Sequence, residues 1–176
     1  RTLRFTAATV QSPASNSVTF TAGVPAAVAI STQPAATAQS GVVFSTAPVV
    51  TVTDGSGNLV PSQAVTVSVG SGSALAFSNG SATTDGSGVA TFTGLSAAGL
   101  AGDRTLLFTA GTAVSSASST VTLSAGLPAT VTINIQAGSP VQSGVNFLTV
   151  PVVTVKDAGG NNVANQAVTV AVATGT

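Results

Sequence analysis

The sequence contains no histidine, cysteine, glutamate, tyrosine, tryptophan or methionine, and its only lysine is Lys156. Without histidine and cysteine, the usual protein sites for zinc and iron cannot form in this chain. Nucleophilic catalysis needs a base beside its serine or threonine, and the usual base is histidine. Lys156 stands next to a glycine-rich turn, where a solvated charge is expected. We therefore predict that the chain is not an enzyme, has no catalytic residues and binds no cofactor.

Charged residues are also scarce. Four basic and four acidic side chains make up 5% of the chain, against about 25% in ordinary globular domains. No basic patch can neutralise phosphates, so nucleic acid is not an expected partner. Proline, glycine, glutamine, serine and threonine interrupt the long uncharged run near the N-terminus, which excludes a transmembrane helix. The absence of cysteine denies the fold a disulfide and is compatible with either redox compartment.

What the chain does contain is a copy of itself. Residues 1–73 align without a gap on residues 104–176, with 41 identities in 73 positions, so the repeat length is 103 residues. A repeat of this length is the size of an independent domain rather than of a solenoid unit. We predict three parts: the last strands of one module (1–23), a complete module (24–126) and the first strands of a further module (127–176). On this interpretation the chain is a stretch of a longer array.

Within the complete module, apolar and polar residues alternate with the period of a β-strand, as in VTVSV at 65–69. Turn residues separate such runs at intervals of about 8–15 residues, the spacing of a β-sandwich. Asn79-Gly80 is typical of a hairpin turn, and residues 94–102 are expected to be a loop. The predicted fold is all-β, with tandem immunoglobulin-like sandwich modules of seven to eight strands. The expected strands cover 28–31, 42–44, 50–53, 65–69, 74–77, 89–92, 106–108 and 121–123.

Comparison of the copies predicts which side chains face the core. Phe108 matches Phe5, whereas its neighbour Leu107 matches Arg4. A position that accepts arginine faces water, so Phe108 is expected inside and Leu107 outside. The same comparison predicts that Phe147 is core in its own copy, and packing is the role expected for all seven phenylalanines. The predicted core of the complete module is Val28, Ile30, Phe44, Val65, Val67, Phe92, Leu106, Phe108, Val121 and Leu123.

The joints between modules are short. Residues 21–25 (TAGVP) and their counterparts 124–128 (SAGLP) lead directly from the last strand of one module into the first strand of the next. Proline fixes φ and the slack is about two residues, so the modules are expected to form a semi-rigid rod. Strand rise predicts that each module adds roughly 40 Å to its length.

Two turn motifs carry a family resemblance. The first is VTDGSGNLV at 52–60, repeated as VKDAGGNNV at 155–163, and the second is TDGSGVATF at 84–92. In their order and spacing they resemble the bacterial immunoglobulin-like repeats of large surface proteins, the invasin/intimin-like and related families. The resemblance implies tandem β-sandwiches that act as stalks or fibres outside the cell, with binding usually assigned to a separate tip domain.

Three aspartates could serve as calcium ligands or as turn residues. Asp54 and Asp157 occupy equivalent turns, and Asp85 opens a similar one. Calcium prefers six to eight oxygens, usually from several carboxylates, whereas each turn offers one carboxylate. We therefore predict Asx turns and no tight metal site. Asn79-Gly80-Ser81 is formally a glycosylation sequon, for which a turn without sugar is the preferred interpretation.

The leading functional hypothesis is a structural module of a long extracellular repeat protein, forming a semi-rigid stalk, surface filament or sheath at the cell surface. An uncharged surface gives little electrostatic repulsion, so copies are expected to associate with one another. One alternative is a ligand-binding adhesin module that recognises glycans or proteins. The other is a spacer of a secreted enzyme.

The two incomplete modules together supply 73 of the 103 positions and lack the counterparts of 74–103. Both are expected to be ordered, with the missing strands supplied by adjacent chain. The alternative is strand exchange, in which residues 1–23 of one copy pack into residues 127–176 of another.

Overall fold

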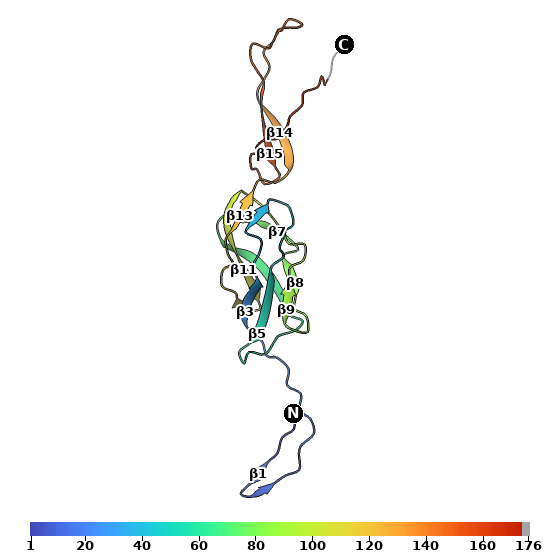
Figure 1. Cartoon of the computed structure of the whole chain (residues 1–176), viewed down its shortest axis with the longest axis vertical. Helices are drawn as coiled ribbons and strands as arrows, with labels where there is room; N and C mark the ends of the chain where they lie inside the picture. The colour runs from blue at the N-terminus through green and yellow to red at the C-terminus, as the bar shows by residue number, and fades with distance from the viewer. Residues whose placement is uncertain (174–176) are drawn as a thin grey trace.

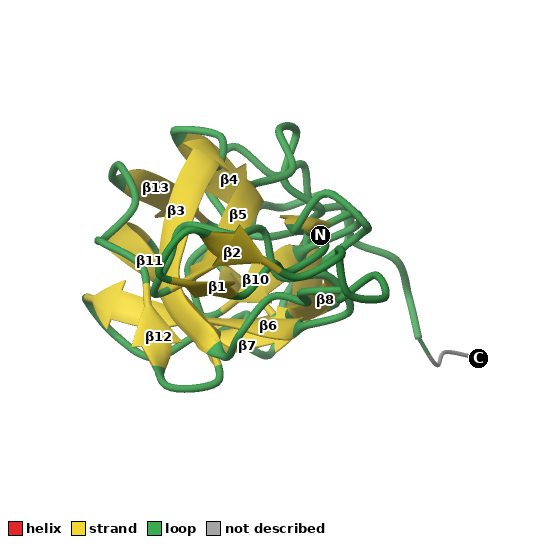
Figure 2. Cartoon of the chain, turned by 90° about the horizontal axis from the view of Figure 1, so that it is seen from below, coloured by secondary structure: helices red, strands yellow, loops and turns green. Residues whose placement is uncertain are grey.

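The chain is an elongated molecule with three parts in a row (Figure 1). A computed structural model describes residues 1–173. A hairpin lies at the N-terminal end, a sandwich in the middle, and a second hairpin at the C-terminal end. Every regular element among the described residues is a strand, and no helix there is long and apolar enough to cross a membrane (Figure 2). The prediction of an all-β fold is confirmed.

One sheet of the central sandwich has three antiparallel strands in the order β3-β5-β9. β3 spans Pro25–Thr32, β5 spans Val49–Asp54 and β9 spans Val89–Thr91. Along β5, Val50 and Val52 are fully buried, whereas the threonines that follow each of them are half-buried. The valine–threonine alternation of the sequence thus becomes the two faces of a strand.

The second sheet has its main strands in the order β4-β13-β11-β6-β8. All neighbours are antiparallel except β13 and β4, which run parallel. A short strand, β12, also pairs with β11. The strands of this sheet are β4 (Thr37–Gln39), β6 (Ala64–Ser71), β8 (Ser81–Thr83), β11 (Gly102–Ala110), β12 (Ala113–Val114) and β13 (Val121–Ser124).

The topology of the sandwich is immunoglobulin-like. β3, β5 and β9 stand where that fold has strands A, B and E, and β6, β11 and β13 stand where it has C, F and G. The strand A position is divided between the two sheets, because β3 pairs with β5 in one sheet whereas β4 pairs with β13 in the other. Two further short strands, β7 (Ala76–Ser78) and β10 (Ser96–Ala98), pair with each other.

The core lies between the two sheets and follows the predicted faces. Phe108 is fully buried and the neighbouring Leu107 is half-buried, which confirms the assignment made from Arg4. Phe92 packs against Phe108 with ring centroids 4.9 Å apart and planes inclined by 56°. Of the ten predicted core residues eight are buried, and Ile30 and Val67 are partly buried against them.

Two predicted segments differ from the structure. Residues 42–44 do not form a strand: Val43 makes an isolated bridge to Ser96, and Phe44 is buried. The chain turns at Gly41, with φ +78°, and then crosses from the second sheet to the first. The predicted loop 94–102 contains β10 and the first residue of β11. With such short strands counted, the sandwich has more strands than the seven to eight expected.

The Asn79-Gly80 turn has the expected backbone but not the expected pairing. Asn79 adopts φ +54°, as a tight turn requires, and its side-chain amide donates to the carbonyl of Gly94 at 3.0 Å. The strands on either side do not pair with each other, since β7 pairs with β10 and β8 with β6. The turn therefore carries the chain between two sheets, and the hairpin prediction was wrong.

The outer parts form hairpins. At the N-terminal end β1 (Thr6–Ala7) pairs with β2 (Val10–Gln11). At the C-terminal end β14 (Pro128–Ile135) pairs with β15 (Val152–Asp157). Both hairpins point away from the sandwich along the long axis (Figure 1).

The prediction that Phe147 is core in its own copy was wrong, because its side chain is exposed. Phe5 and Phe20 are exposed too, so packing does not account for all seven phenylalanines. The physical reason is that each outer part has strands on one side of the expected core and none facing them. A side chain on the inner face of a strand is buried only when a second layer covers it.

Candidate functional site

Among the described residues, no three of the acidic, histidine or cysteine type lie together. Arg104 is buried, and its guanidinium donates to the backbone carbonyls of Ser73, Leu100 and Asp103 at 2.7–2.9 Å. It thus holds neighbouring loops together instead of presenting a charge at the surface. The most organised polar arrangement lies at the joints between modules.

The turn after β5 ties the central sandwich to the chain that enters it. Oδ2 of Asp54 accepts a hydrogen bond from the backbone N–H of Gly23 at 2.8 Å. Oδ1 accepts from the N–H groups of Ser56 and Asn58, both at 2.9 Å. The Asn58 amide also donates to Oδ2 at 2.9 Å. The predicted Asx turn is confirmed, and its second function is to anchor the preceding linker.

The turn after β15 repeats this arrangement at the junction between the central sandwich and the C-terminal part, called here the upper joint. Oδ2 of Asp157 accepts from the backbone N–H of Gly126 at 2.6 Å, and Oδ1 accepts from the N–H of Asn161 at 2.8 Å. The side-chain amide of Asn161 donates to Oδ2 at 2.8 Å. The linker between β13 and β14 is therefore held by the turn after β15, which belongs to the C-terminal part.

Asn161 also reaches back to the central sandwich. Its amide nitrogen donates to the carbonyl of Gly99 at 2.9 Å, and its amide oxygen accepts from the N–H of Ala101 at 2.7 Å. One side chain thus bonds to Asp157 in its own module and to a loop of the preceding one. Asn161 therefore connects the C-terminal part directly to the central sandwich, independently of the linker.

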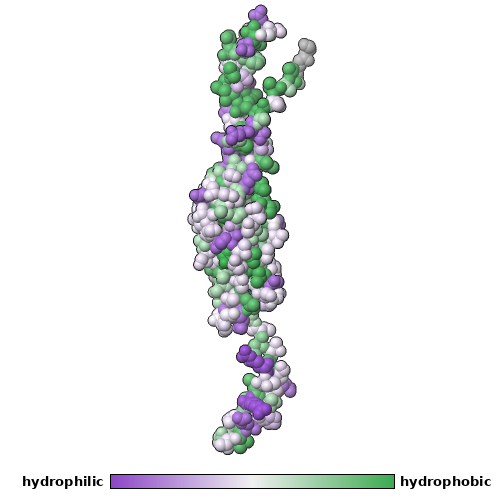
Figure 3. All heavy atoms as spheres, in the orientation of Figure 1, coloured by the Kyte–Doolittle hydropathy of each residue, from purple (hydrophilic) through white to green (hydrophobic). Residues whose placement is uncertain are grey.

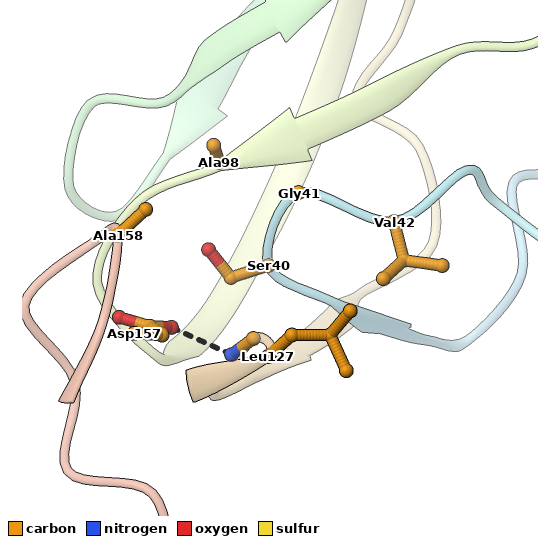
Figure 4. Close-up of a pocket in the computed structure, with 8 residues that line it drawn as sticks. Ser40, Gly41, Val42, Ala98, Leu127, Asp157 and Ala158 are labelled. Carbon is orange, nitrogen blue, oxygen red and sulfur yellow. Dashed lines mark hydrogen bonds between the residues drawn. The ribbon is translucent and has the colours of Figure 1, made fainter. Parts of the chain in front are cut away.

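The linker itself fits closely against the sandwich. A Cβ placed on Gly126 would collide with the carbonyl oxygen of Ser40. Ser40 is buried, and its hydroxyl exchanges hydrogen bonds with Gly99 at 3.1–3.2 Å. Figure 4 shows Ser40, Leu127 and Asp157 around a hollow of about 190 Å³ at this joint. Pockets that hold small-molecule ligands are typically about 300–1,000 Å³, so the hollow is a gap between modules.

Both joint aspartates are held in the charged form. The Asn58 amide and the N–H of Gly23 hold the pKa of Asp54 well below its usual range. Burial by itself would raise the pKa of Asp157, but hydrogen bonds from Asn161 and Gly126 outweigh it, and the net pKa is lowered. Hydrogen bonds to the charged form favour that form.

These contacts bear on the calcium alternative. In both joint aspartates each carboxylate oxygen already accepts hydrogen bonds from the protein. Asp85 forms an Asx turn as well, with Oδ1 accepting from Ser87 and Val89 at 2.8 and 3.0 Å. A cation at either joint would have to displace these donors. The absence of a tight metal site stays a prediction, which melting curves in calcium and in chelator would check.

The two joints are equivalent in sequence but not in contacts. Gly23, Asp54 and Asn58 correspond to Gly126, Asp157 and Asn161. At the lower joint, the junction between the N-terminal part and the central sandwich, the Asn58 side chain donates hydrogen bonds to Asp54. At the upper joint Asn161 adds the two bonds to the preceding module. The side-chain amide of Asn58 is therefore equivalent to that of Asn161, but it has no counterpart of the loop at Gly99 and Ala101 to bind.

The Asx turns could be predicted from the sequence, but their role in the joint could not. No prediction was made for Ser40-Gly41, or for a contact of Asn161 outside its own loop. A signal was available in the repeat, because Ser40-Gly41 recurs as Ser143-Gly144 and Asn58 recurs as Asn161. Loops that recur in a repeat whose other loops differ indicate a shared contact.

No protein-family profile and no curated protein matches the sequence. One solved structure with a similar arrangement is FdeC, an adhesin of Escherichia coli, which is 21% identical with a TM-score of 0.47. The match covers 81% of this chain and 45% of that one, so the chain spans less than half of its length. At this level of similarity the fold rests on the strands described above.

Proposed function

We propose that the chain is part of a semi-rigid extracellular stalk or surface filament built from tandem immunoglobulin-like modules. Residues 24–126 are one complete module, and residues 1–23 and 127–176 belong to its neighbours. The role is mechanical: the modules set a distance and a direction. Support comes from the repeat in the sequence, from the immunoglobulin-like topology of the middle part and from the joint.

The contact across the upper joint is the observation that carries this proposal. Asp157 holds the linker at Gly126, and Asn161 bonds to Gly99 and Ala101 of the preceding module. A hydrogen bond to a charged group contributes about 1.5–3 kcal/mol and a neutral one about 1 kcal/mol. Their sum exceeds the thermal energy of about 0.6 kcal/mol several times, so bending at the joint is opposed. A linker without such contacts would act as a hinge.

The surface of the central module supports the filament form of the proposal. In Figure 3 its visible face is mostly pale, with few strongly hydrophilic residues. Four acidic and four basic side chains in the whole chain give a net charge of zero. Such a surface does not keep neighbouring rods apart by repulsion. Antibody labelling of intact source cells tests the location at the surface.

Joint rigidity can be measured directly because the chain has no cysteine. Spin labels on Ser68→Cys and Thr132→Cys, both at exposed positions, report the distance between the sandwich and β14. A narrow distance distribution is expected, and Asn161→Ala should broaden it because the two bonds across the joint are lost. Asn58→Ala is the matched control and should leave the distribution unchanged. A broad distribution in the unmodified joint would reject the semi-rigid stalk.

A further inference from the structure

The loop between β10 and β11, residues 99–101, presents one acceptor and one donor to the C-terminal part and is called here the receiving loop. The carbonyl of Gly99 accepts a hydrogen bond from the side-chain amide of Asn161 at 2.9 Å, and the N–H of Ala101 donates to the amide oxygen at 2.7 Å. A carboxamide has both a donor and an acceptor, whereas an ionised carboxylate only accepts. The receiving loop is therefore complementary to asparagine and not to aspartate.

Two side chains of the central sandwich hold the receiving loop in place. The hydroxyl of Ser40 accepts from the N–H of Gly99 at 3.1 Å and donates to its carbonyl at 3.2 Å. Nη2 of Arg104 donates to the carbonyl of Leu100 at 2.8 Å. Both contacts are independent of Asn161. The shape of the loop is therefore set by the sandwich itself.

Arg104 occupies a position that the strand pattern assigns to an apolar residue. On β11 Arg104 and Leu106 are buried whereas Asp103 is exposed, so the arginine lies on the core face of the strand. A buried charge is costly unless hydrogen bonds compensate it. The compensation comes from the carbonyls of Ser73, Leu100 and Asp103. An apolar residue could fill this space but could not hold the Leu100 carbonyl.

Two glycines make room for the buried arginine. Gly72 has φ +92°, and a Cβ placed on it would collide with Cδ of Arg104. A Cβ on Gly102 would lie 3.1 Å from Nη1 of the same side chain. The guanidinium is planar and presents its N–H groups in a rigid fork, so the carbonyls that it binds are held at fixed positions. The receiving loop consequently resists displacement.

The turn after β15 approaches the receiving loop most closely at Gly159. A Cβ placed on this residue would lie 2.7 Å from the carbonyl oxygen of Gly99, closer than side chains approach backbone atoms. The same oxygen already accepts hydrogen bonds from Ser40 and Asn161. It cannot move aside without weakening both bonds. Position 159 therefore has no room for a side chain while the joint is closed.

The backbone of this turn does not itself require glycine at position 159. The φ angle of Gly159 lies outside the left-handed region, whereas that of the next residue, Gly160, is +85°. In the lower joint the equivalent position is Ser56, whose N–H donates to Asp54 in a turn of the same kind. Contact with the receiving loop is therefore the physical reason for a glycine at 159.

We propose that the receiving loop selects the module that follows it. It accepts a module whose turn has asparagine at the position of Asn161 and no side chain at the position of Gly159. The turn at 157–161 (DAGGN) meets both conditions. The turn of the central module at 54–58 (DGSGN) has the asparagine but carries Ser56 in place of the glycine. The two turns are therefore not interchangeable, and Gly159 is the specificity-determining residue of the upper joint.

Selection by a steric clash gives the order of similar modules a physical basis. A protein discriminates between partners as effectively by a clash with the wrong one as by contacts with the right one. Here one Cβ on an exposed turn would be enough, and the fold of the module would not change. The inference rests on the proposed function, because it uses the module boundaries and the closed joint.

The test uses the 176-residue polypeptide with spin labels on Ser68→Cys and Thr132→Cys. Gly159→Ser introduces the residue that the central module has in this turn and should broaden the distance distribution. Gly159→Ala should have the same effect, because the collision involves Cβ and not the hydroxyl. Ala158→Gly is the matched control. It changes the neighbouring residue of the same turn to its counterpart Gly55, adds no atom and should leave the distribution narrow.

Hydrogen exchange, followed by NMR, reports the contact itself. The N–H of Ala101 donates to Asn161, so its exchange should be slow while the joint is closed. In Gly159→Ser this exchange should become about tenfold faster or more. Asn161→Asp should have the same effect, because its carboxylate cannot donate to Gly99. Each of these substitutions lies outside residues 24–126, so unchanged melting of the sandwich shows that the variants are folded.

The outcomes separate this inference from the proposed function. A narrow distribution in both the unmodified chain and Gly159→Ser, with unchanged exchange at Ala101, would overturn the selection and leave the semi-rigid stalk intact. A broad distribution in the unmodified chain would overturn both. Equal broadening in Ala158→Gly and Gly159→Ser would show that any change in the turn opens the joint, which would also overturn the selection.

Discussion

The central sandwich and the outer parts share side chains but not environments. Phe108 is 0% exposed and its counterpart Phe5 is 68% exposed, while Val65 and Val168 are 0% and 49% exposed. The pairing of β3 with β5 recurs in β14 with β15. Val168 lies in no strand, although the local pattern around it repeats that of Val65 on β6. Burial requires a second sheet, which each outer part lacks.

One region behaves alike in both copies. Val155 and Asp157 are buried as Val52 and Asp54 are, although the rest of the C-terminal part is open. Asp157 ends β15 next to the joint and lines the hollow there together with Ser40 and Ala98 of the central sandwich (Figure 4). Contact with the preceding module therefore contributes to the burial of Asp157. The joint is a packed unit in its own right.

The largest expected effect separates the two environments. Phe108→Ala removes a fully buried ring that packs on Phe92, and should destabilise the sandwich by about 3–5 kcal/mol. Phe5→Ala removes the equivalent ring from an exposed position. It should change the unfolding of the sandwich by less than about 0.5 kcal/mol. Urea unfolding at low protein concentration, followed by circular dichroism, measures both, and equal effects would contradict the comparison.

A second pair compares the two joints. Gly126→Ala places a methyl group against the carbonyl of Ser40, whereas Gly23→Ala meets Asp54 at ordinary contact distance, 3.4 Å. Overpacking typically costs about 1–3 kcal/mol, and this cost can be relieved by opening the joint. The distance distribution between labels on Ser68→Cys and Thr132→Cys should therefore broaden for Gly126→Ala and not for Gly23→Ala. No broadening in either variant would show that the linker fits loosely.

A third prediction concerns the effect of low pH on the upper joint. Hydrogen bonds lower the pKa of Asp157 below its ordinary value of 3.8. A carboxylate whose folded pKa is depressed stabilises the folded state above its unfolded pKa, and this contribution is lost as the pH falls through the folded value. The joint should therefore keep its narrow distance distribution at pH 7 and at pH 5 and loosen well below pH 3.8. Asp157→Asn should be loose at every pH, and a transition above pH 3.8 would contradict the assignment.

The smallest effect is expected on the outer face. Leu107 is half-buried, and its counterpart in the repeat is Arg4. Leu107→Arg should therefore cost less than about 1 kcal/mol, because the long side chain can lie along the sheet with its charge in water. Phe108→Arg, one residue away, should prevent folding. If thermal melting shows a similar loss for both, the two faces of β11 are assigned incorrectly.

Strands with a regular alternation of apolar and polar residues could be predicted from the sequence. Local sequence signals failed to predict strand partners where the pairing depends on the whole sandwich. The alternation in 65–69 predicted β6 and its buried face correctly. Asn79-Gly80 predicted a turn correctly but not its partners, because β7 and β8 belong to different sheets. The alanine-rich segment that contains β10 has no strong strand propensity, and pairing with β7 makes it a strand.

The candidate site shows the same division. Asp54, Asp85 and Asp157 were predicted as Asx turns, since an aspartate that opens a glycine-rich turn bonds to its own backbone whatever surrounds it. The contact of Asn161 with Gly99 and Ala101 joins residues about 60 positions apart. No local pattern contains that information, because it depends on how one module is set against the next.

The sequence by itself determined the strand pattern of the central sandwich and the inward face of β5, β6 and β11. These properties follow from residue types and from spacings of two, which act over a few neighbouring residues. The tertiary structure alone decided which of two identical side chains is buried and which turn becomes a joint. Both depend on a second layer or a neighbouring module, and burial is a property of what lies opposite a residue rather than of the residue itself.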